Sequence, residues 1–145
     1  MTIVAREFPQ DSQPEDLLPE LTADNAPFWE GLQNGRLVVQ QCTACRRHRY
    51  PIAPVCPHCG AVGWAWHEIG QHGTIHSWVR YTKSYLAEFA DLMPYVVVCV
   101  AFPEGIRMFG RLADAGADNP VIGAAVQGEI ERWPGGRCVM RFVAG

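Results

Sequence analysis

Four of the six cysteines stand in two Cys-x-x-Cys pairs, a spacing that is typical of metal ligands. The pairs are Cys42 with Cys45 and Cys56 with Cys59, and ten residues separate them. The turn inside each pair can direct both sulfurs toward one ion, and two pairs complete a tetrahedral shell of four thiolates. A shell closed in this way leaves no position for water or substrate. The spacing therefore predicts one metal ion that stabilises the fold and takes no part in catalysis.

Zinc is the metal that this donor set favours, because soft sulfur ligands in a tetrahedral array select it; a rubredoxin-like iron site is the alternative. A redox role of the two pairs would need a βαβ context, which the surrounding sequence does not provide. The short gap between the pairs fits a zinc ribbon, in which two tight turns face each other.

A Cys2His2 finger is a second arrangement that the spacing permits, since His72 and His76 follow Cys59 at suitable distances. In such a finger both histidines lie on a helix, whereas Gly70 and Gly73 favour a strand or a turn here. The finger would also leave the first cysteine pair without a role. We therefore expect both histidines to lie outside any metal shell.

The two remaining cysteines, Cys99 and Cys138, lie in apolar strand-like segments, where a free thiol behaves as a small hydrophobic side chain. The sequence contains no G-x-G-x-x-G, P-loop, G-x-S-x-G or H-E-x-x-H motif. It therefore predicts a protein that is not catalytic on its own.

A short helix and a strand precede the cysteines. The helix is predicted to begin near Asp24 and to end at Asn34-Gly35, with Phe28 and Trp29 on its apolar face. An apolar strand over residues 37–41 follows and leads into the first cysteine pair. We expect the two aromatic residues of the helix to be exposed and to form a docking surface.

Short strand-like runs separated by turn residues fill the rest of the chain. These runs cover residues 64–69, 74–82, 94–102, 106–113, 126–133 and 137–143. The connection at 83–93 contains a short helical turn, and Pro134-Gly135-Gly136 predicts a tight hairpin before the last run. The pattern predicts a small closed β-barrel. The expected organisation is an acidic mobile arm (1–22), a docking helix (23–36), a zinc ribbon (37–63) and a barrel (64–145).

Composition limits the class of protein. Of the 145 residues, 48% are hydrophobic and 19% are charged, and no apolar run approaches the ~18 residues of a membrane span. No basic-then-apolar signal peptide opens the sequence, and we expect a cytoplasmic protein. Residues 1–30 carry seven acidic side chains and one arginine, so the rest of the chain is mildly basic. Three prolines and weak periodicity within residues 1–22 underlie the prediction of a mobile arm.

The order of these parts resembles the DUF35 family, whose members combine a zinc ribbon with an OB-fold. The resemblance covers residues 24–145. It is carried by the cysteine pairs up to Gly60, by the segment from Gly70 to Ser77, by Pro94-Tyr95-Val96-Val97, by Glu104-Gly105 and by Ile122-Gly123. It departs from the family at Arg46, where glycine is frequent, and at residues 52–55, where Pro-Pro-Arg is replaced. The implied fold is mainly β: an N-terminal short helix, a rubredoxin-like zinc ribbon and a C-terminal OB-fold β-barrel.

The resemblance implies an accessory subunit. DUF35 proteins pair with thiolase-like proteins, and the small chain stabilises the partner or helps to shape its CoA site. We therefore expect a hetero-oligomer with a thiolase or aldolase, acting on aromatic or steroid-derived acyl-CoA, in which the partner binds most of the CoA thioester and this chain binds one structural zinc ion. The candidate contacts to the partner or to CoA phosphates are the helix aromatics and several basic residues: Phe28, Trp29, Arg46, Arg47, Arg49, Arg80 and Lys83.

The alternative function is binding of single-stranded nucleic acid, which OB-folds and zinc ribbons also perform with aromatic platforms and basic grooves. Trp78 and Tyr81 lie on a predicted barrel strand where such platforms occur. The acidic leader and the small positive charge of the rest of the chain disfavour contact with phosphates. The accessory subunit is therefore the leading hypothesis.

Overall fold

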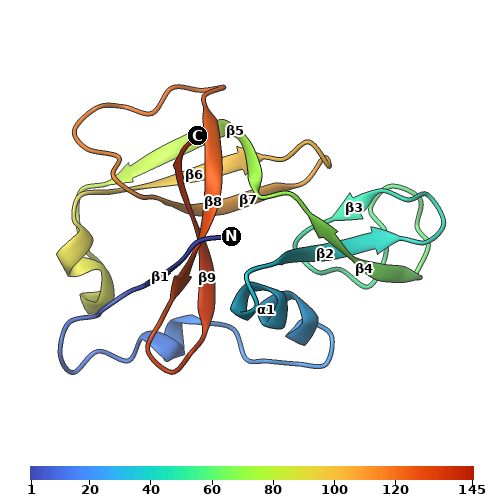
Figure 1. The fold of residues 1–145 in the computed structure, drawn as a ribbon, viewed down its shortest axis with the longest axis horizontal. Helices are drawn as coiled ribbons and strands as arrows, with labels where there is room; N and C mark the ends of the chain where they lie inside the picture. The colour runs from blue at the N-terminus through green and yellow to red at the C-terminus, as the bar shows by residue number, and fades with distance from the viewer.

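The computed structural model describes all 145 residues and contains two β-sheets, one α-helix and two short 3-10 helices (Figure 1). In chain order the elements are β1 (Ile3–Ala5), η1 (Pro14–Leu17), α1 (Ala26–Gln33), β2 (Leu37–Cys42), β3 (His48–Arg49), β4 (Trp64–Ile69), β5 (His72–Tyr81), η2 (Ala87–Leu92), β6 (Tyr95–Ala101), β7 (Arg107–Leu112), β8 (Ala125–Arg132) and β9 (Cys138–Ala144). The mainly β fold class is confirmed.

The larger sheet closes into a five-stranded barrel. Strands β8, β5, β6, β7 and β9 are neighbours in that order, and β8 also pairs with β9, which closes the ring. Strand β5 pairs with β6 from Thr74 to Tyr81, with a bulge between Ile75 and Ser77 that bends β5. Val96, Val98 and Val100 of β6 are fully buried, as expected for an apolar central strand. The barrel is the predicted OB-fold.

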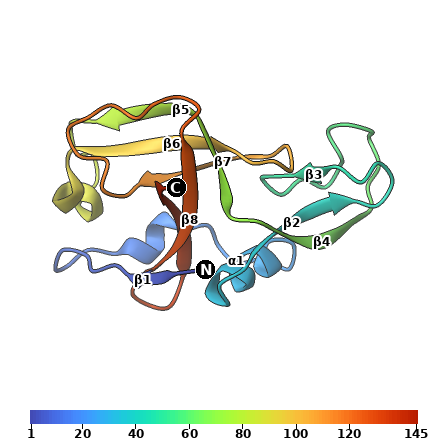
Figure 2. The same cartoon turned by 45° about the horizontal axis from the view of Figure 1, so that its top comes forward.

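The smaller sheet is the ribbon, in the order β3-β2-β4 (Figure 2). Strand β4 pairs with β2 along its whole length, from Leu37 opposite Ile69 to Cys42 opposite Trp64. The ribbon sheet therefore continues to Ile69, beyond the boundary at residue 63 that the sequence suggested. The sequence predicted the bounds of this strand correctly. It did not predict the pairing with β2, because strand pairing depends on distant residues and local periodicity gives no information about them.

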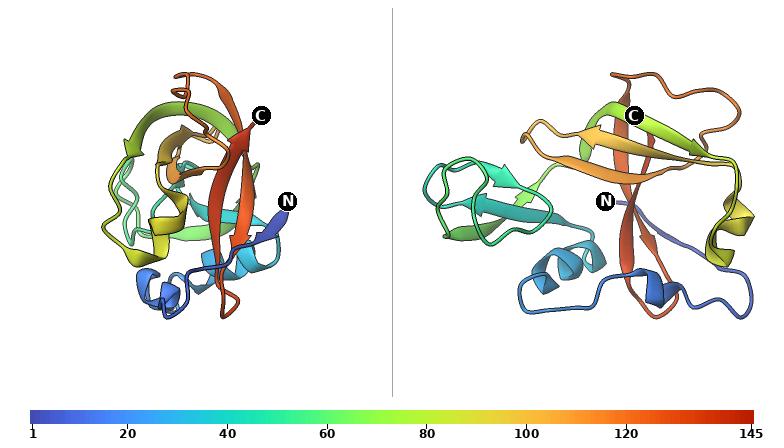
Figure 3. Two further views of the ribbon diagram at one scale, coloured as in Figure 1. Left: turned by 90° about the vertical axis from the view of Figure 1, so that its left-hand side faces the viewer. Right: turned by 180° about the vertical axis from the view of Figure 1, so that it is seen from behind.

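Helix α1 lies between the two sheets, as the rear view in Figure 3 shows. Phe28 and Leu32 are 6% and 1% exposed, and both belong to the same hydrophobic core as β2 and the barrel strands. The prediction that Phe28 is exposed is therefore wrong. The phenyl ring packs against the rings of Trp29 and Tyr50, because the apolar face of a short helix gains stability only when it is buried.

The first residues of the acidic arm contact the barrel. Strand β1 pairs in parallel with β8, and the Arg6 side chain is buried. Arg6 donates to the backbone oxygen of Glu88 at 2.8 Å and to the carboxylate of Asp91 at 3.2 Å, both in η2. The Phe8 ring packs edge-on against Trp133. The mobility of residues 1–22 as a whole stays a prediction.

No helix of this protein is long and apolar enough to cross a membrane.

The substitution Leu32→Ala tests whether α1 joins the two sheets. Because the Leu32 side chain is 1% exposed in the shared core, its truncation should lower the free energy of unfolding by about 2–5 kcal/mol. Urea unfolding followed by tryptophan fluorescence, with zinc present throughout, measures this change. Leu21→Ala is the matched control, since Leu21 is 50% exposed and its truncation should cost no more than about 0.5 kcal/mol. Equal costs at the two positions would contradict the assigned role of α1.

Candidate functional site

The four paired cysteines meet at one end of the ribbon. All four sulfurs lie within 4.8 Å of one another, a cluster that could hold one metal ion. Cys42 Sγ lies 3.6 Å from Cys59 Sγ, and Cys45 Sγ lies 3.7 Å from Cys56 Sγ, so each sulfur is close to one from the other pair. The structure therefore brings together the four ligands that the spacing predicts.

Two similar turns aim the sulfurs inward. In the first, the Arg46 amide donates to the Cys42 carbonyl at 3.0 Å; in the second, the Gly60 amide donates to the Cys56 carbonyl at 2.9 Å. Arg46 and Gly60 have φ angles of +67° and +79°, in the left-handed region where glycine is favoured. Arg46 therefore adopts a backbone conformation that glycine reaches more easily than arginine does.

Backbone amides also stabilise the charged form of two sulfurs. The Cys45 amide donates to Cys42 Sγ at 3.5 Å, and this hydrogen bond is the main cause that lowers the pKa of Cys42 to about 6. The His58 amide donates to Cys56 Sγ at 3.4 Å. Since a thiolate and not a thiol binds metal, these amides favour the state that a metal requires. The donor set fits a structural zinc ion, which would link the two turns through four sulfur bonds.

The other two cysteines and the two histidines of the alternative finger lie outside the cysteine cluster, as the sequence predicts. Cys99 and Cys138 are buried and free, in β6 and β9, as expected for small hydrophobic side chains. His72 and His76 lie on β5 and are absent from the metal-competent cluster, which excludes the Cys2His2 arrangement.

The basic residues predicted to contact CoA or a partner do not share one surface. Arg46 and Arg47 are exposed on the first turn, and Arg47 Nη1 lies 3.1 Å from His58 Nδ1. Arg49 is buried at 4% exposure, where it donates to Gln40 Oε1 at 3.2 Å and stacks over Trp64. The expectation of a surface contact at Arg49 is therefore wrong, since strand alternation turns it under the ribbon.

Of the remaining predicted contacts, Arg80 and Trp29 interact with other parts of the chain, and Lys83 is exposed. Arg80 donates to the carbonyl oxygens of Gly116 and Asp118 at 3.0 and 2.8 Å, so it fastens the loop between β7 and β8. Lys83 is exposed, with its ammonium 5.5 Å from the Tyr85 ring. The half-buried Trp29 carries the guanidinium of Arg137 over its ring at 4.6 Å.

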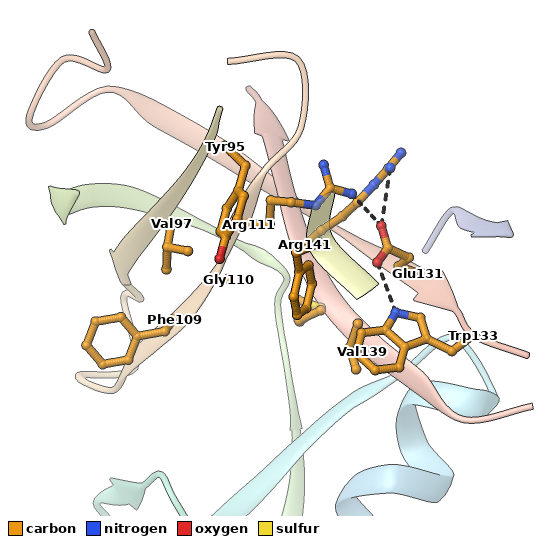
Figure 4. Close-up of a pocket in the computed structure, with 11 residues that line it drawn as sticks. Tyr95, Val97, Phe109, Gly110, Arg111, Glu131, Trp133, Val139 and Arg141 are labelled. Carbon is orange, nitrogen blue, oxygen red and sulfur yellow. Dashed lines mark hydrogen bonds and ion pairs between the residues drawn. The ribbon is translucent and has the colours of Figure 1, made fainter. Parts of the chain in front are cut away.

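Sequence reasoning missed a groove on the outer side of the barrel. This outer barrel groove has a volume of about 290 Å³ and is lined by η2 and by strands β6 to β9 with their flanking residues (Figure 4). Its apolar part includes Tyr95, Val97 and Val139, and Phe109 at its edge is 73% exposed. The signal in the sequence was the alternation of β7, which places Phe109 and Arg111 on one face.

A buried carboxylate lies at the polar end of the groove. Glu131 is 4% exposed and accepts hydrogen bonds from Arg111 and, at 3.0 Å, from the Trp133 indole. Arg141 and Arg6 lie 3.6 and 3.8 Å from its oxygens. Three arginines thus surround one carboxylate, and Figure 4 shows Arg111 and Arg141 converging on it. The cluster holds the side chains at this end of the groove in place.

The ribbon and the barrel each match a domain model named for the same protein, ChsH2. Residues 29–63 match the ChsH2 rubredoxin-like zinc ribbon domain, and residues 66–131 match the ChsH2 C-terminal OB-fold domain. A DUF35 domain-containing scaffold protein of Methanothermobacter thermautotrophicus is 30% identical over 66% of this chain and 71% of its own length. This chain belongs to the DUF35 family. The zinc-ribbon and OB-fold predictions are confirmed.

Two longer relatives match this chain over part of their own length. A probable enoyl-CoA hydratase alpha subunit of Thermomonospora curvata is 36% identical over 74% of this chain, and the 3-oxo-4,17-pregnadiene-20-carboxyl-CoA hydratase alpha subunit of Mycobacterium tuberculosis is 27% identical over 87%. The matched region is only 33% and 40% of these two proteins, so the chain spans well under half of their length.

Solved structures give the same fold. A chain of the structure titled Ltp2-ChsH2(DUF35) aldolase has a TM-score of 0.78 and 31% identity, covering 88% of this chain and 98% of that one. A DUF35 protein of unknown function from Sulfolobus solfataricus has a TM-score of 0.59 at 18% identity, over 85% and 86% of the two chains, and shows the fold alone.

Replacing one clustered cysteine should remove the metal. Cys42→Ser and Cys59→Ser are each expected to lower the zinc content from one ion per chain to a small fraction, because one ligand of a closed four-sulfur shell is lost. Elemental analysis of the purified variants measures the metal, and circular dichroism measures the loss of ribbon structure. Cys99→Ser is the control, since Cys99 lies outside the cluster and this variant should keep its zinc. Full zinc retention in both cluster variants would contradict the assigned shell.

Proposed function

We propose that this chain is a non-catalytic accessory subunit of a complex that processes acyl-CoA, and that its outer barrel groove docks a thiolase-fold partner. Phe109 carries this proposal. Its ring is 73% exposed at the edge of an apolar groove, although aromatic side chains of this size are usually covered in a folded protein. An exposed aromatic beside a preformed hollow is typical of a protein contact.

The names of similar proteins support a CoA thioester as the substrate of the complex. Two relatives are named as alpha subunits of hydratases that act on CoA thioesters, one of them steroid-derived, and the similar solved structure is titled an aldolase. The words subunit and scaffold in these names support a hetero-oligomer. We therefore extend to this chain a role in the conversion of steroid-derived or aromatic acyl-CoA by a partner that supplies the catalytic groups.

Within this proposal the ribbon is rigid and keeps a fixed position relative to the groove. Cys42, Cys45, Cys56 and Cys59 bind one zinc ion, which orders the turn that carries the exposed Arg46 and Arg47. Guanidinium groups at this position can reach the phosphates of a CoA that is bound mainly by the partner. Trp29, Arg80 and Lys83 remain candidate contacts, whereas Phe28 and Arg49 act by packing, since both are buried.

Nucleic-acid binding has less support from the side chains that it would use. Trp78 packs against the hydrophobic core, and the Tyr81 ring stacks on Tyr95 with centroids 4.9 Å apart. A base would have to displace the core contacts of Trp78 before it could stack on that ring, and Tyr95 covers one face of the Tyr81 ring.

Co-purification tests whether the groove binds the partner. The protein, tagged and purified from its native host at moderate salt, should co-purify with a thiolase-fold chain identified by mass spectrometry. Phe109→Asp should reduce the retained partner at least about tenfold, because a charge would be buried at the contact. Val121→Asp is the matched control: Val121 is 69% exposed in the loop between β7 and β8, away from the groove, and its variant should keep the partner.

Two outcomes would contradict the proposal. Equal retention by both variants would exclude the groove as the docking site. A high ratio of absorbance at 260 nm to that at 280 nm, without a protein partner, would instead identify nucleic acid as the ligand.

A further inference from the structure

Two histidines approach each other on the ribbon, apart from the cysteine cluster. His48 Nε2 lies 2.9 Å from His67 Nδ1, and the two ring centroids are 5.0 Å apart. His48 of β3 pairs with Gln41, and His67 of β4 pairs with Val39. Since alternate residues of β2 project to one face, both imidazoles extend from the flanking strands over the same face of the ribbon.

A carboxylate from the barrel lies near this pair. Glu104 belongs to the turn between β6 and β7, and the tip of this hairpin points toward β3 in Figure 2. Burial and His67 lower the pKa of His48, while the negative charge of Glu104 acts in the opposite direction. Glu104 Oε2 is shielded from solvent and has no hydrogen-bond partner. An acceptor that lacks a donor in such a place favours a cation beside it.

We propose that His48 and His67 bind a divalent transition-metal ion at the junction of ribbon and barrel, with the carboxylate of Glu104 supplying negative charge. Imidazole nitrogens bind such ions at about 2.0–2.1 Å, so two of them in neighbouring positions at a right angle lie about 2.9 Å apart. The observed 2.9 Å equals this value and is also the length of the hydrogen bond that the two imidazoles form without an ion, so binding would replace that hydrogen bond. Right-angled ligand pairs occur in the square-planar and octahedral geometries of copper and nickel, and imidazole suits both metals. The pair is partly exposed, so an ion can reach it.

Bound there, the ion would link three segments that are distant in sequence. It would join β3 to β4 across β2 and would attract the β6–β7 hairpin toward the ribbon through Glu104. This second ion would therefore act at the junction, whereas the cysteine cluster lies within the ribbon. Its occupancy would change the rigidity between the two sheets without any change in the OB-fold itself.

Nickel titration of the full-length, zinc-loaded and tag-free protein tests the site. We expect calorimetry to report one nickel ion per chain, with affinity reduced at least about tenfold in His48→Ala and in His67→Ala. Glu104→Gln should weaken binding by a smaller factor. His72→Ala is the matched control, since His72 is an exposed histidine of β5 and its variant should bind as the unaltered protein does. Zinc content measured in parallel shows that the cysteine cluster stays loaded.

The ring protons of the five histidines give an independent readout. Copper(II), which is paramagnetic in either geometry, should broaden the signals of His48 and His67 at the lowest additions, before those of His72 and His76. Equal broadening of all histidine signals, or nickel affinity unchanged in both His48→Ala and His67→Ala, would overturn the proposal and identify the pair as hydrogen-bonded only.

Discussion

The buried face of α1 is the contact on which the arrangement of this protein depends. Phe28 packs toward Tyr50 of the ribbon, and Leu32 lies in the same core as Met108 and Met140 of the barrel. A helix of eight residues is not stable by itself, so it forms because both sheets cover it. In return it gives the two sheets a common core. The position of the ribbon relative to the outer barrel groove follows from this helix.

A metal ion in the cysteine cluster would stabilise the ribbon for a related reason. Its sheet has two long strands and one of two residues, which is too little apolar surface to fold alone. Four sulfur–metal bonds would supply the missing stability, because the binding free energy of a structural ion is also folding free energy. The barrel is different: its closed ring and its row of buried valines on β6 form a core without a metal. One metal-dependent and one metal-independent part, joined by α1, suit a scaffold that presents fixed surfaces to a partner.

The sequence predicted the features that depend on neighbouring residues. The cysteine spacing defined the cluster, because each turn is local, and turn residues defined the barrel strands to within a few positions. It could not predict features that need distant partners. The bounds of β4 were correct, yet its pairing with β2 was not evident, and the burial of Phe28 and Arg49 depends on packing between segments. The groove escaped prediction because Phe109, Glu131 and Arg141 come from three strands that meet only after the ring closes.

We propose above that this chain assists a catalytic partner and is not catalytic on its own. The most direct measurement is the rate of acyl-CoA consumption by three samples: this chain alone, the co-purified partner alone, and the two recombined in equal amounts. We expect no turnover by this chain and a faster or longer-lived reaction in the recombined pair than in the partner alone. Turnover by this chain alone, or a partner whose rate and lifetime are unchanged by its addition, would exclude the role of an accessory subunit.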